Sequence, residues 1–267
     1  MKKRLVIILL AAAVIVAAGC FMLKRQADPA AIGEDGPVSI ESYEPVMGEA
    51  VEVETQCPEV SGLCLSPRGN GLLAASDEDG VYHISWTGET EPFYVEKGWF
   101  DCEGVTMDPA TKDVYYIVEG RQEVRRLKAP DYQDPELICL IDDVGYRTNS
   151  GLEGITWYKD GTLLLGNQKH PSQLIRYSLS EGITGRWETG TSEIADLCYD
   201  PVRDVLWIAD SDRHTINLCT LEGQIRRSYP MPFIDNGEGL YVDHEHGCIW
   251  IGDDTSSKLY RIPFENL

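Results

Sequence analysis

Short apolar runs separated by polar turns follow one another from about residue 38 to residue 267. They fall into a repeat that opens with a small or acidic pair followed by alternating apolar residues. No stretch of this region has the periodicity of an amphipathic helix, so the pattern predicts an all-β fold. The five openings are Ser61–Leu65, Glu103–Met107, Glu153–Trp157, Ala195–Tyr199 and Glu238–Val242, which lie 42, 50, 42 and 43 residues apart.

Each repeat contains enough strands for one propeller blade. The opening leads through a turn such as Asp108–Pro109 to a continuously apolar strand such as Val114–Val118, a pattern typical of a strand covered on both faces. A third strand alternates, as in Gln173–Tyr177, and a fourth is more polar, as in Glu136–Leu140. Four strands per repeat predict a single β-propeller with five four-stranded blades. The alternative is six blades, with a degenerate one in the 50-residue step or near Glu49–Glu59.

The ring needs a strand from elsewhere to close. The fifth repeat ends at Leu267, only five residues after its third strand, and so lacks a fourth. Val38–Tyr43 is strand-like and precedes the first repeat, so we expect it to supply the missing outer strand. Closure in this way removes an open sheet edge.

The first 25 residues have a different pattern. Lys2–Arg4 is basic and Leu5–Leu23 is almost wholly apolar, which indicates an export signal. Either Ala17–Cys20 acts as a lipobox and Cys20 is lipidated after cleavage, or the apolar run remains as a membrane-spanning helix. In both cases we expect the body to be tethered to the cell (inner) membrane and to face the periplasm or exterior. The predicted domains are a signal or anchor (1–25), a polar linker (26–37) and the β-propeller (38–267).

The formal net charge is −21, and the acidic residues are spread along the chain. Such a surface repels phosphate backbones, so nucleic acid is excluded as a partner. An acidic surface confers solubility and can attract cations. Apart from Cys20, seven cysteines remain, without the CxxC spacing of a metal site, and an odd number cannot all pair. We expect buried free thiols, with or without one disulfide.

One mouth of the predicted channel collects charged residues. Because neighbouring strands in a blade are antiparallel, inner strands start where second strands end. The openings place Glu103, Glu153 and Glu238 at this mouth, where they must share protons, pair with cations or bind a metal. Carboxylate oxygens suit Ca²⁺, so these three are the predicted metal ligands. The predicted binding residues beside them are Glu119, Arg121, Lys169, Asp210, Arg213 and Asp253.

A purely structural interpretation stays open for the same glutamates, which can cap backbone N–H groups or pair with Arg121, Lys169 or Arg213. His170 and Lys169 are the candidates for catalytic roles, because both follow a second strand at the same mouth. His244–His246 is similar to a zinc motif, but it lies in a predicted turn at the opposite face and is interpreted as a solvated turn.

The chain resembles the YjiK/CarP family, also called SdiA-regulated proteins. The resemblance rests on Gly151–Trp157 with its continuation to Lys169–Pro171, on Asp101–Arg121, and on the stretch from Glu238–Leu240 to Tyr260–Ile262. It covers residues 37–267 and the N-terminal membrane segment. The resemblance implies a β-propeller at the plasma membrane with a link to calcium, and it implies no defined activity.

Two functions follow as expectations. The first is a binding or sensing module that presents its channel mouth to Ca²⁺, a small polar ligand or a protein partner. The second is a Ca²⁺-dependent hydrolase similar to propeller phytases or lactonases. In that case the ion would polarise a phosphoryl or lactone oxygen, Lys169 or Arg121 would neutralise charge, and His170 would act as base.

Overall fold

The computed structural model describes residue 40 and residues 42–96, 101–143 and 150–267. They belong to the second of the two units into which the chain divides, Ser39–Leu267. The predicted anchor and linker, with the Cys20 lipobox, lie outside the described residues. Within the described part of the chain, no helix has the length and apolarity needed to cross a membrane.

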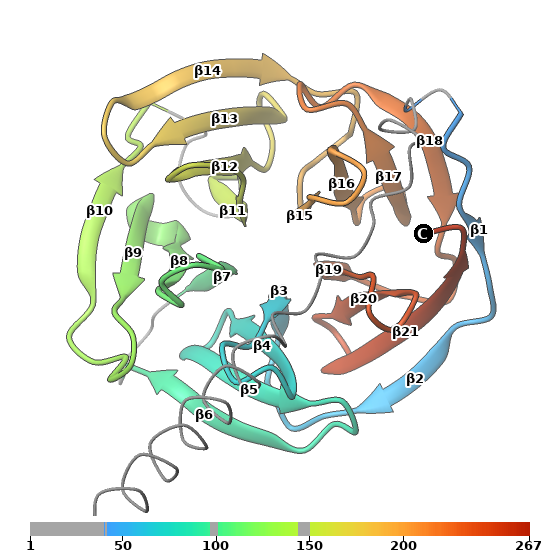
Figure 1. The fold of residues 1–267 in the computed structure, drawn as a ribbon, viewed down its shortest axis with the longest axis horizontal. Coiled ribbons are helices and arrows are strands. Elements are labelled where there is room, and N and C mark those ends of the chain that lie inside the picture. Colours follow the sequence, from blue (N-terminus) through green and yellow to red (C-terminus); the bar gives the residue numbers. More distant parts are fainter. Residues whose placement is uncertain (1–39, 41, 97–100, 144–149) are drawn as a thin grey trace, which may run out of the picture. The chain divides into compact units, whose positions relative to one another are not determined.

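The described residues form five antiparallel sheets arranged as a ring (Figure 1). The strands of the first four blades, from the centre outwards, are β3 (Val60–Leu65), β4 (Gly71–Ser76), β5 (Gly80–Ser85), β6 (Thr90–Val95); β7 (Cys102–Met107), β8 (Val114–Val118), β9 (Glu123–Leu127), β10 (Glu136–Leu140); β11 (Leu152–Trp157), β12 (Thr162–Asn167), β13 (Gln173–Ser178), β14 (Gly182–Glu188); and β15 (Asp196–Asp200), β16 (Val205–Asp210), β17 (Thr215–Cys219), β18 (Ile225–Pro230). The fifth blade contains β19 (Gly237–Asp243), β20 (Cys248–Asp253) and β21 (Lys258–Glu265). Each inner strand contacts the next, and β19 contacts β3. The predicted five-bladed β-propeller is confirmed.

The closing strand was placed wrongly by the sequence pattern. β21 pairs with two N-terminal strands, β1 (Val46–Met47) and β2 (Val51–Glu54), and the described residues of 38–43 contain no strand. The segment considered for a sixth blade therefore completes the fifth. Charge favours this pairing, because Lys258 Nζ lies 2.9 Å from Glu52 Oε2 and 3.0 Å from Glu54 Oε1.

The hydrophobic core is divided among the five interfaces between neighbouring blades, with one buried cluster at each. The second strands contribute to two clusters at once. Tyr116 of β8 packs between blades one and two, whereas Tyr115 and Ile117 pack between blades two and three. Both faces of β8 are therefore covered, as its continuous apolar pattern predicts.

The cysteines belong to these interfaces. All seven in the described residues are free thiols, six buried and Cys139 half-buried, which confirms the prediction of buried free thiols. Burial raises the pKa of Cys198 and Cys219 to about 12, so both stay protonated and unreactive. The seven are Cys57, Cys64, Cys102, Cys139, Cys198, Cys219 and Cys248.

A short 3-10 helix, η1 (Glu119–Arg121), follows β8 at the end of the blade that faces the channel mouth. It ends at Gln122, which has a positive φ of 55°. The turn holds Glu119 in a buried position, and the carboxylate oxygen Oε1 of Glu119 accepts the Gly151 N–H at 2.7 Å. This loop thereby joins the second blade to the third beside the channel.

Candidate functional site

The glutamates of the repeat openings lie at β-bulges. The register of β7 against β8 shifts between Cys102 and Val105, where Glu103 lies. β11 and β19 shift register at the corresponding places, around Glu153 and Glu238. A bulge bends a strand and re-aims its side chains. All three glutamates line one cavity at this mouth of the channel.

This acidic cavity has a volume of about 290 Å³. Its lining contains seven carboxylates and two carboxamides, and no lysine, arginine or histidine of the described residues lines it. So many carboxylates close together must keep protons or attract cations. The lining residues are Asp77, Asp101, Glu103, Glu119, Glu153, Gln168, Asn236, Glu238 and Asp254.

Five of the carboxylates form two close groups. In the first acidic group, Asp77, Asp101 and Glu103, one oxygen of each residue lies within 4.8 Å of the others. The second acidic group, Glu103, Glu119 and Glu153, meets the same limit, and all three residues are buried. Glu103 belongs to both groups. Hydrogen bonds from backbone N–H groups orient the outer members, because Gly120 N donates to Asp101 Oδ2 at 2.5 Å and Gly151 N donates to Glu119.

Glu238 lies in the same cavity but outside both groups. Asn236 Nδ2 donates to Glu238 Oε1 at 2.9 Å and to Asp254 Oδ2 at 3.3 Å. The three predicted metal ligands therefore meet at one mouth, while the close groups combine two of them with Asp77, Asp101 and Glu119. Their role in holding a metal stays a prediction.

The electrostatics of the cavity follow from burial and mutual repulsion. Burial raises the pKa of Glu103 and Glu153 well above the usual value, and the charges of neighbouring carboxylates add to the rise. Burial, then the charge of Asp254, raises the pKa of Glu238 to about 8. Burial and the hydrogen bond with Asp101 raise the pKa of Asp77 to about 6. Without cations, the cavity holds protons at neutral pH.

Gln168 supplies an oxygen of a different kind. It directly follows β12, is 9% exposed and lines the cavity. Its backbone is fixed on both sides, because Gln168 N donates to Gly151 O and Ile194 N donates to Gln168 O. Its side-chain oxygen Oε1 is buried without a hydrogen-bond partner. An unpaired buried carboxamide oxygen beside carboxylates is a ready neutral ligand for a hard cation.

Sequence reasoning missed Asp101, Gln168 and Asn236 as site residues. Asp101 and Asn236 each stand two positions before the glutamate of a repeat opening, so a signal was present in the spacing. Asp101 has a positive φ of 56° and still accepts the Gly120 N–H, a conformation that no sequence pattern indicates. Gln168 carries no comparable signal, because its role depends on the absence of a local partner.

The other predicted binding residues lie outside the cavity lining. Lys169 Nζ pairs with buried Glu193 at 2.7 Å and with Asp212 at 3.1 Å. Asp210 accepts the Ser192 and Arg213 N–H groups.

The predicted binding residues Arg121, Arg213 and Asp253, and the catalytic candidate His170, also lie outside the cavity lining. Arg213 Nη1 donates to Gly190 O, and Asp253 accepts the Asn236 N–H and the Ser256 hydroxyl. Arg121 and His170 are exposed. Lys169 and Arg213 thus bind groups of neighbouring loops and not the glutamates of the repeat openings.

Asp196 marks the inner limit of the site. It stands in the fourth repeat opening, where the other blades have Gly62, Gly104, Gly154 and Gly239. Inner strands are close at this level, since a Cβ on Gly62 would lie 2.5 Å from the Glu103 carbonyl oxygen. β15 has no register shift against β16, so the aspartate replaces both the glycine and the bulge.

The Asp196 carboxylate lies between the inner strands of the propeller. Its oxygens accept N–H groups of Leu63 at 3.2 Å, Leu197 at 2.8 Å and Leu240 at 2.8 Å, and also the Ile155 N–H. These donors come from the inner strands of four blades. Burial raises the pKa of Asp196, and the four backbone hydrogen bonds oppose that rise. Asp196 therefore ties the ring together and separates the two ends of the channel.

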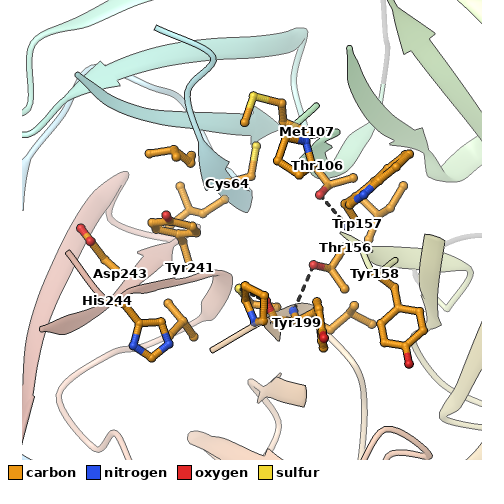
Figure 2. Close-up of a pocket in the computed structure, with 18 of the residues that line it drawn as sticks. Cys64, Thr106, Met107, Thr156, Trp157, Tyr158, Tyr199, Tyr241, Asp243 and His244 are labelled. Atoms are coloured by element: carbon orange, nitrogen blue, oxygen red, sulfur yellow. Dashed lines mark hydrogen bonds between the residues drawn. The ribbon is translucent and has the colours of Figure 1, made fainter. Parts of the chain in front are cut away.

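The opposite mouth is apolar. A cavity of about 350 Å³ there is lined largely by aromatic and aliphatic side chains, including Trp157, Tyr199 and Tyr241 (Figure 2). Its two threonine hydroxyls are engaged, because Thr106 Oγ1 accepts the Trp157 N–H at 2.8 Å and Thr156 Oγ1 accepts the Tyr199 N–H at 3.0 Å. Both hydrogen bonds connect inner strands of neighbouring blades.

The two histidines at this face do not form a common site. His244 Nε2 lies 2.7 Å from Asp200 Oδ1, whereas His246 Nδ1 lies 2.8 Å from Asp243 Oδ2. They occupy the turn between β19 and β20. The interpretation of this motif as a turn at the opposite face is confirmed.

No family model matches the sequence, and no curated protein matches it either. The resemblance to YjiK/CarP proteins therefore stays a prediction. Solved structures are similar in fold. Glutaminyl cyclase from Myxococcus xanthus matches at TM-score 0.62 and 12% identity, over 83% of this chain and 96% of that one. A gluconolactonase from Xanthomonas campestris matches at TM-score 0.55 and 11% identity, over 77% and 72%.

Two further solved structures are longer than this chain. An auxiliary nutrient-binding protein from Bacteroides ovatus matches at TM-score 0.51 and 13% identity, over 80% of this chain and 61% of that one. Virginiamycin B lyase from Staphylococcus aureus has TM-score 0.48 and 16% identity, over 76% of this chain, and this chain spans 65% of its length. At these identities, the three matches with TM-scores above 0.5 show the β-propeller fold alone.

Proposed function

We propose that this protein is a membrane-tethered, extracytoplasmic β-propeller that binds Ca²⁺ through its acidic cavity and acts as a binding or sensing module. The observation that carries the proposal is the lining of that cavity. Seven carboxylates and the unpartnered Gln168 oxygen meet there, without a lining cationic side chain among the described residues. Ca²⁺ takes six to eight oxygen ligands, and the close groups offer oxygens of this kind.

A binding role is favoured over hydrolysis by what the cavity lacks. Hydrolysis at the ion needs a base and a group that neutralises developing charge. The residues considered for these roles, His170, Lys169 and Arg121, lie outside the lining, and Lys169 is paired with Glu193 and Asp212. The lactonase and nutrient-binding structures share only the fold, so neither activity is transferred to this chain.

Thermal unfolding of the full-length protein in detergent tests the calcium proposal. Ca²⁺ should raise Tm, because a ligand that binds only the native state adds RT ln(1 + [L]/Kd), about 2.7 kcal/mol at a hundred times Kd. Glu103→Gln should abolish most of the shift. Glu245→Gln, which removes an exposed carboxylate at the opposite mouth, is the matched control and should keep it. An unchanged Tm of the wild-type protein at millimolar Ca²⁺ would refute the proposal.

The proposed location rests on the basic and apolar pattern of residues 2–23. A protease added to intact spheroplasts should digest the propeller, and antibodies to the propeller should label it without permeabilisation. Labelling that appears only after permeabilisation would place the propeller in the cytoplasm instead.

A further inference from the structure

We infer that the acidic cavity holds a pair of divalent cations bridged by Glu103, one in each acidic group. The inference rests on the proposed function, because it specifies how many ions the same cavity takes and which side chains hold each. Its starting point is that Glu103 is the one residue common to both close groups of carboxylates in the described residues.

The two groups lie at successive blade junctions. The first combines Asp77, which follows β4 of blade one, with Asp101 and Glu103 at the start of blade two. The second combines Glu103 with Glu119, the first residue of η1, and Glu153 on β11 of blade three. Glu103 stands between the junctions and has two carboxylate oxygens. A carboxylate shared in this way is the usual bridge of two-metal sites, whose ions are about 3.5–4 Å apart.

Charge balance favours two ions over one. The five carboxylates of the two groups carry five negative charges when ionised, and no lysine, arginine or histidine of the described residues lines the cavity. One divalent ion would leave most of that charge uncompensated inside a largely buried space. Two divalent ions would leave a single negative charge on these five carboxylates, a much smaller cost in a largely buried space.

Ligand supply points the same way. Glu119 accepts the Gly151 N–H through one oxygen, and Asp101 accepts the Gly120 N–H through one, so a backbone hydrogen bond fixes the direction of one carboxylate in each group. Gln168 provides an independent sign of a ligand, because its buried Oε1 has no partner and lines the same cavity. Gln168 follows β12 in blade three, the blade of Glu153, so we assign its oxygen to the second ion.

Isothermal titration of the full-length protein with Ca²⁺ in detergent tests the inference. The wild type should bind two ions. Asp77→Asn should lose the first ion and keep the second, Glu153→Gln should do the reverse, and Glu103→Gln should lose both. Glu238→Gln removes the same unit of charge from the same cavity outside both groups, so it should weaken binding yet keep two ions.

The possible stoichiometries separate the two claims. Two ions in the wild type support the inference, one ion overturns it and leaves the proposed function standing, and none overturns both. Mn²⁺ provides a second measurement, since a carboxylate-bridged pair is spin-coupled. Its electron paramagnetic resonance spectrum should differ from that of isolated Mn²⁺ and revert to the isolated form in Asp77→Asn. Two bound Mn²⁺ ions with an uncoupled spectrum would contradict the Glu103 bridge.

Discussion

The two mouths of the channel are built from opposite ends of the same inner strands. In β7 the second residue, Glu103, lines the acidic cavity and the last, Met107, lines the apolar one. Glu153 and Trp157 hold the same positions in β11. The pairing of each inner strand with its neighbour also differs between the two mouths. A bulge lies at the acidic end of β3, β7, β11 and β19, whereas pairing at the other end is regular.

The fold therefore tolerates an irregular backbone at the mouth where the carboxylates gather. At the apolar mouth, Thr106 and Thr156 satisfy backbone N–H groups and the remaining lining packs through side-chain contact. At the acidic mouth, carboxylates are crowded beyond what stability requires, which is typical of a functional site. Between them, Asp196 joins four inner strands.

Replacing Asp196, whose carboxylate joins four inner strands, should have the largest effect on stability. Asp196→Ala leaves four backbone N–H groups without an acceptor in a fully buried position, so the free energy of unfolding should fall by about 3–5 kcal/mol. Urea denaturation measures the loss. A loss below about 1 kcal/mol would mean that water or rearranged strands satisfy these groups, and the two mouths would then not be held apart by this residue.

The pH dependence of stability should distinguish the acidic mouth from the rest. The folded-state pKa of Glu238 is raised from 4.5 to about 8 and that of Asp77 from 3.8 to about 6. Between the unfolded and folded values the native state keeps a proton that the unfolded state has lost, so calcium-free protein should become less stable as pH rises from about 5 to 8. Each such carboxyl contributes about 1.4 kcal/mol per pH unit at most.

Denaturation at several pH values in a chelator, with Glu238→Gln for comparison, measures this slope. The variant should have a shallower slope between pH 6 and 8, where Asp77 has already ionised in the folded state. Saturating Ca²⁺ should reverse the wild-type slope, because cations compete with protons for the same oxygens. A calcium-free protein that gains stability over this range would contradict the assigned electrostatics.

The smallest expected effect lies at the apolar mouth. Thr156→Val keeps the side-chain shape but removes the acceptor of the Tyr199 N–H, so the free energy of unfolding should fall by about 1 kcal/mol. The Ca²⁺-induced rise in Tm should be unchanged, because the two cavities share no lining residue. A lost calcium response would show that the mouths are coupled.

Much of the fold was predictable because the strand pattern is local. β8 and β10 have the predicted bounds, Val114–Val118 and Glu136–Leu140. The closing strand could not be predicted, because Val38–Tyr43 and Val51–Glu54 are similarly strand-like. Only the pairing with β21, with its ion pair from Lys258, selects Val51–Glu54. Local pattern indicates a strand but not its partner.

The site was predictable in part for a related reason. Glu103, Glu153 and Glu238 could be placed at one mouth because the repeat spacing fixes where inner strands begin. Lys169 and Arg213 also follow second strands at this mouth. An ion pair with Glu193 holds Lys169 outside the cavity, and a hydrogen bond to a backbone carbonyl does the same for Arg213. Side-chain direction at a strand end depends on bulges and loop partners, which a single sequence does not encode in its spacing.

The pairing of β2 with β21 also sets an order of assembly. Each of the first four blades is contiguous in the chain and can form from neighbouring hairpins as synthesis proceeds. The fifth blade can form only after the whole domain has been synthesised, because Val51 near its start pairs with Arg261 near its end. Until that late step β2 and the outer edge of β21 have no partner strand, and this is the interval in which aggregation or chaperone capture would act.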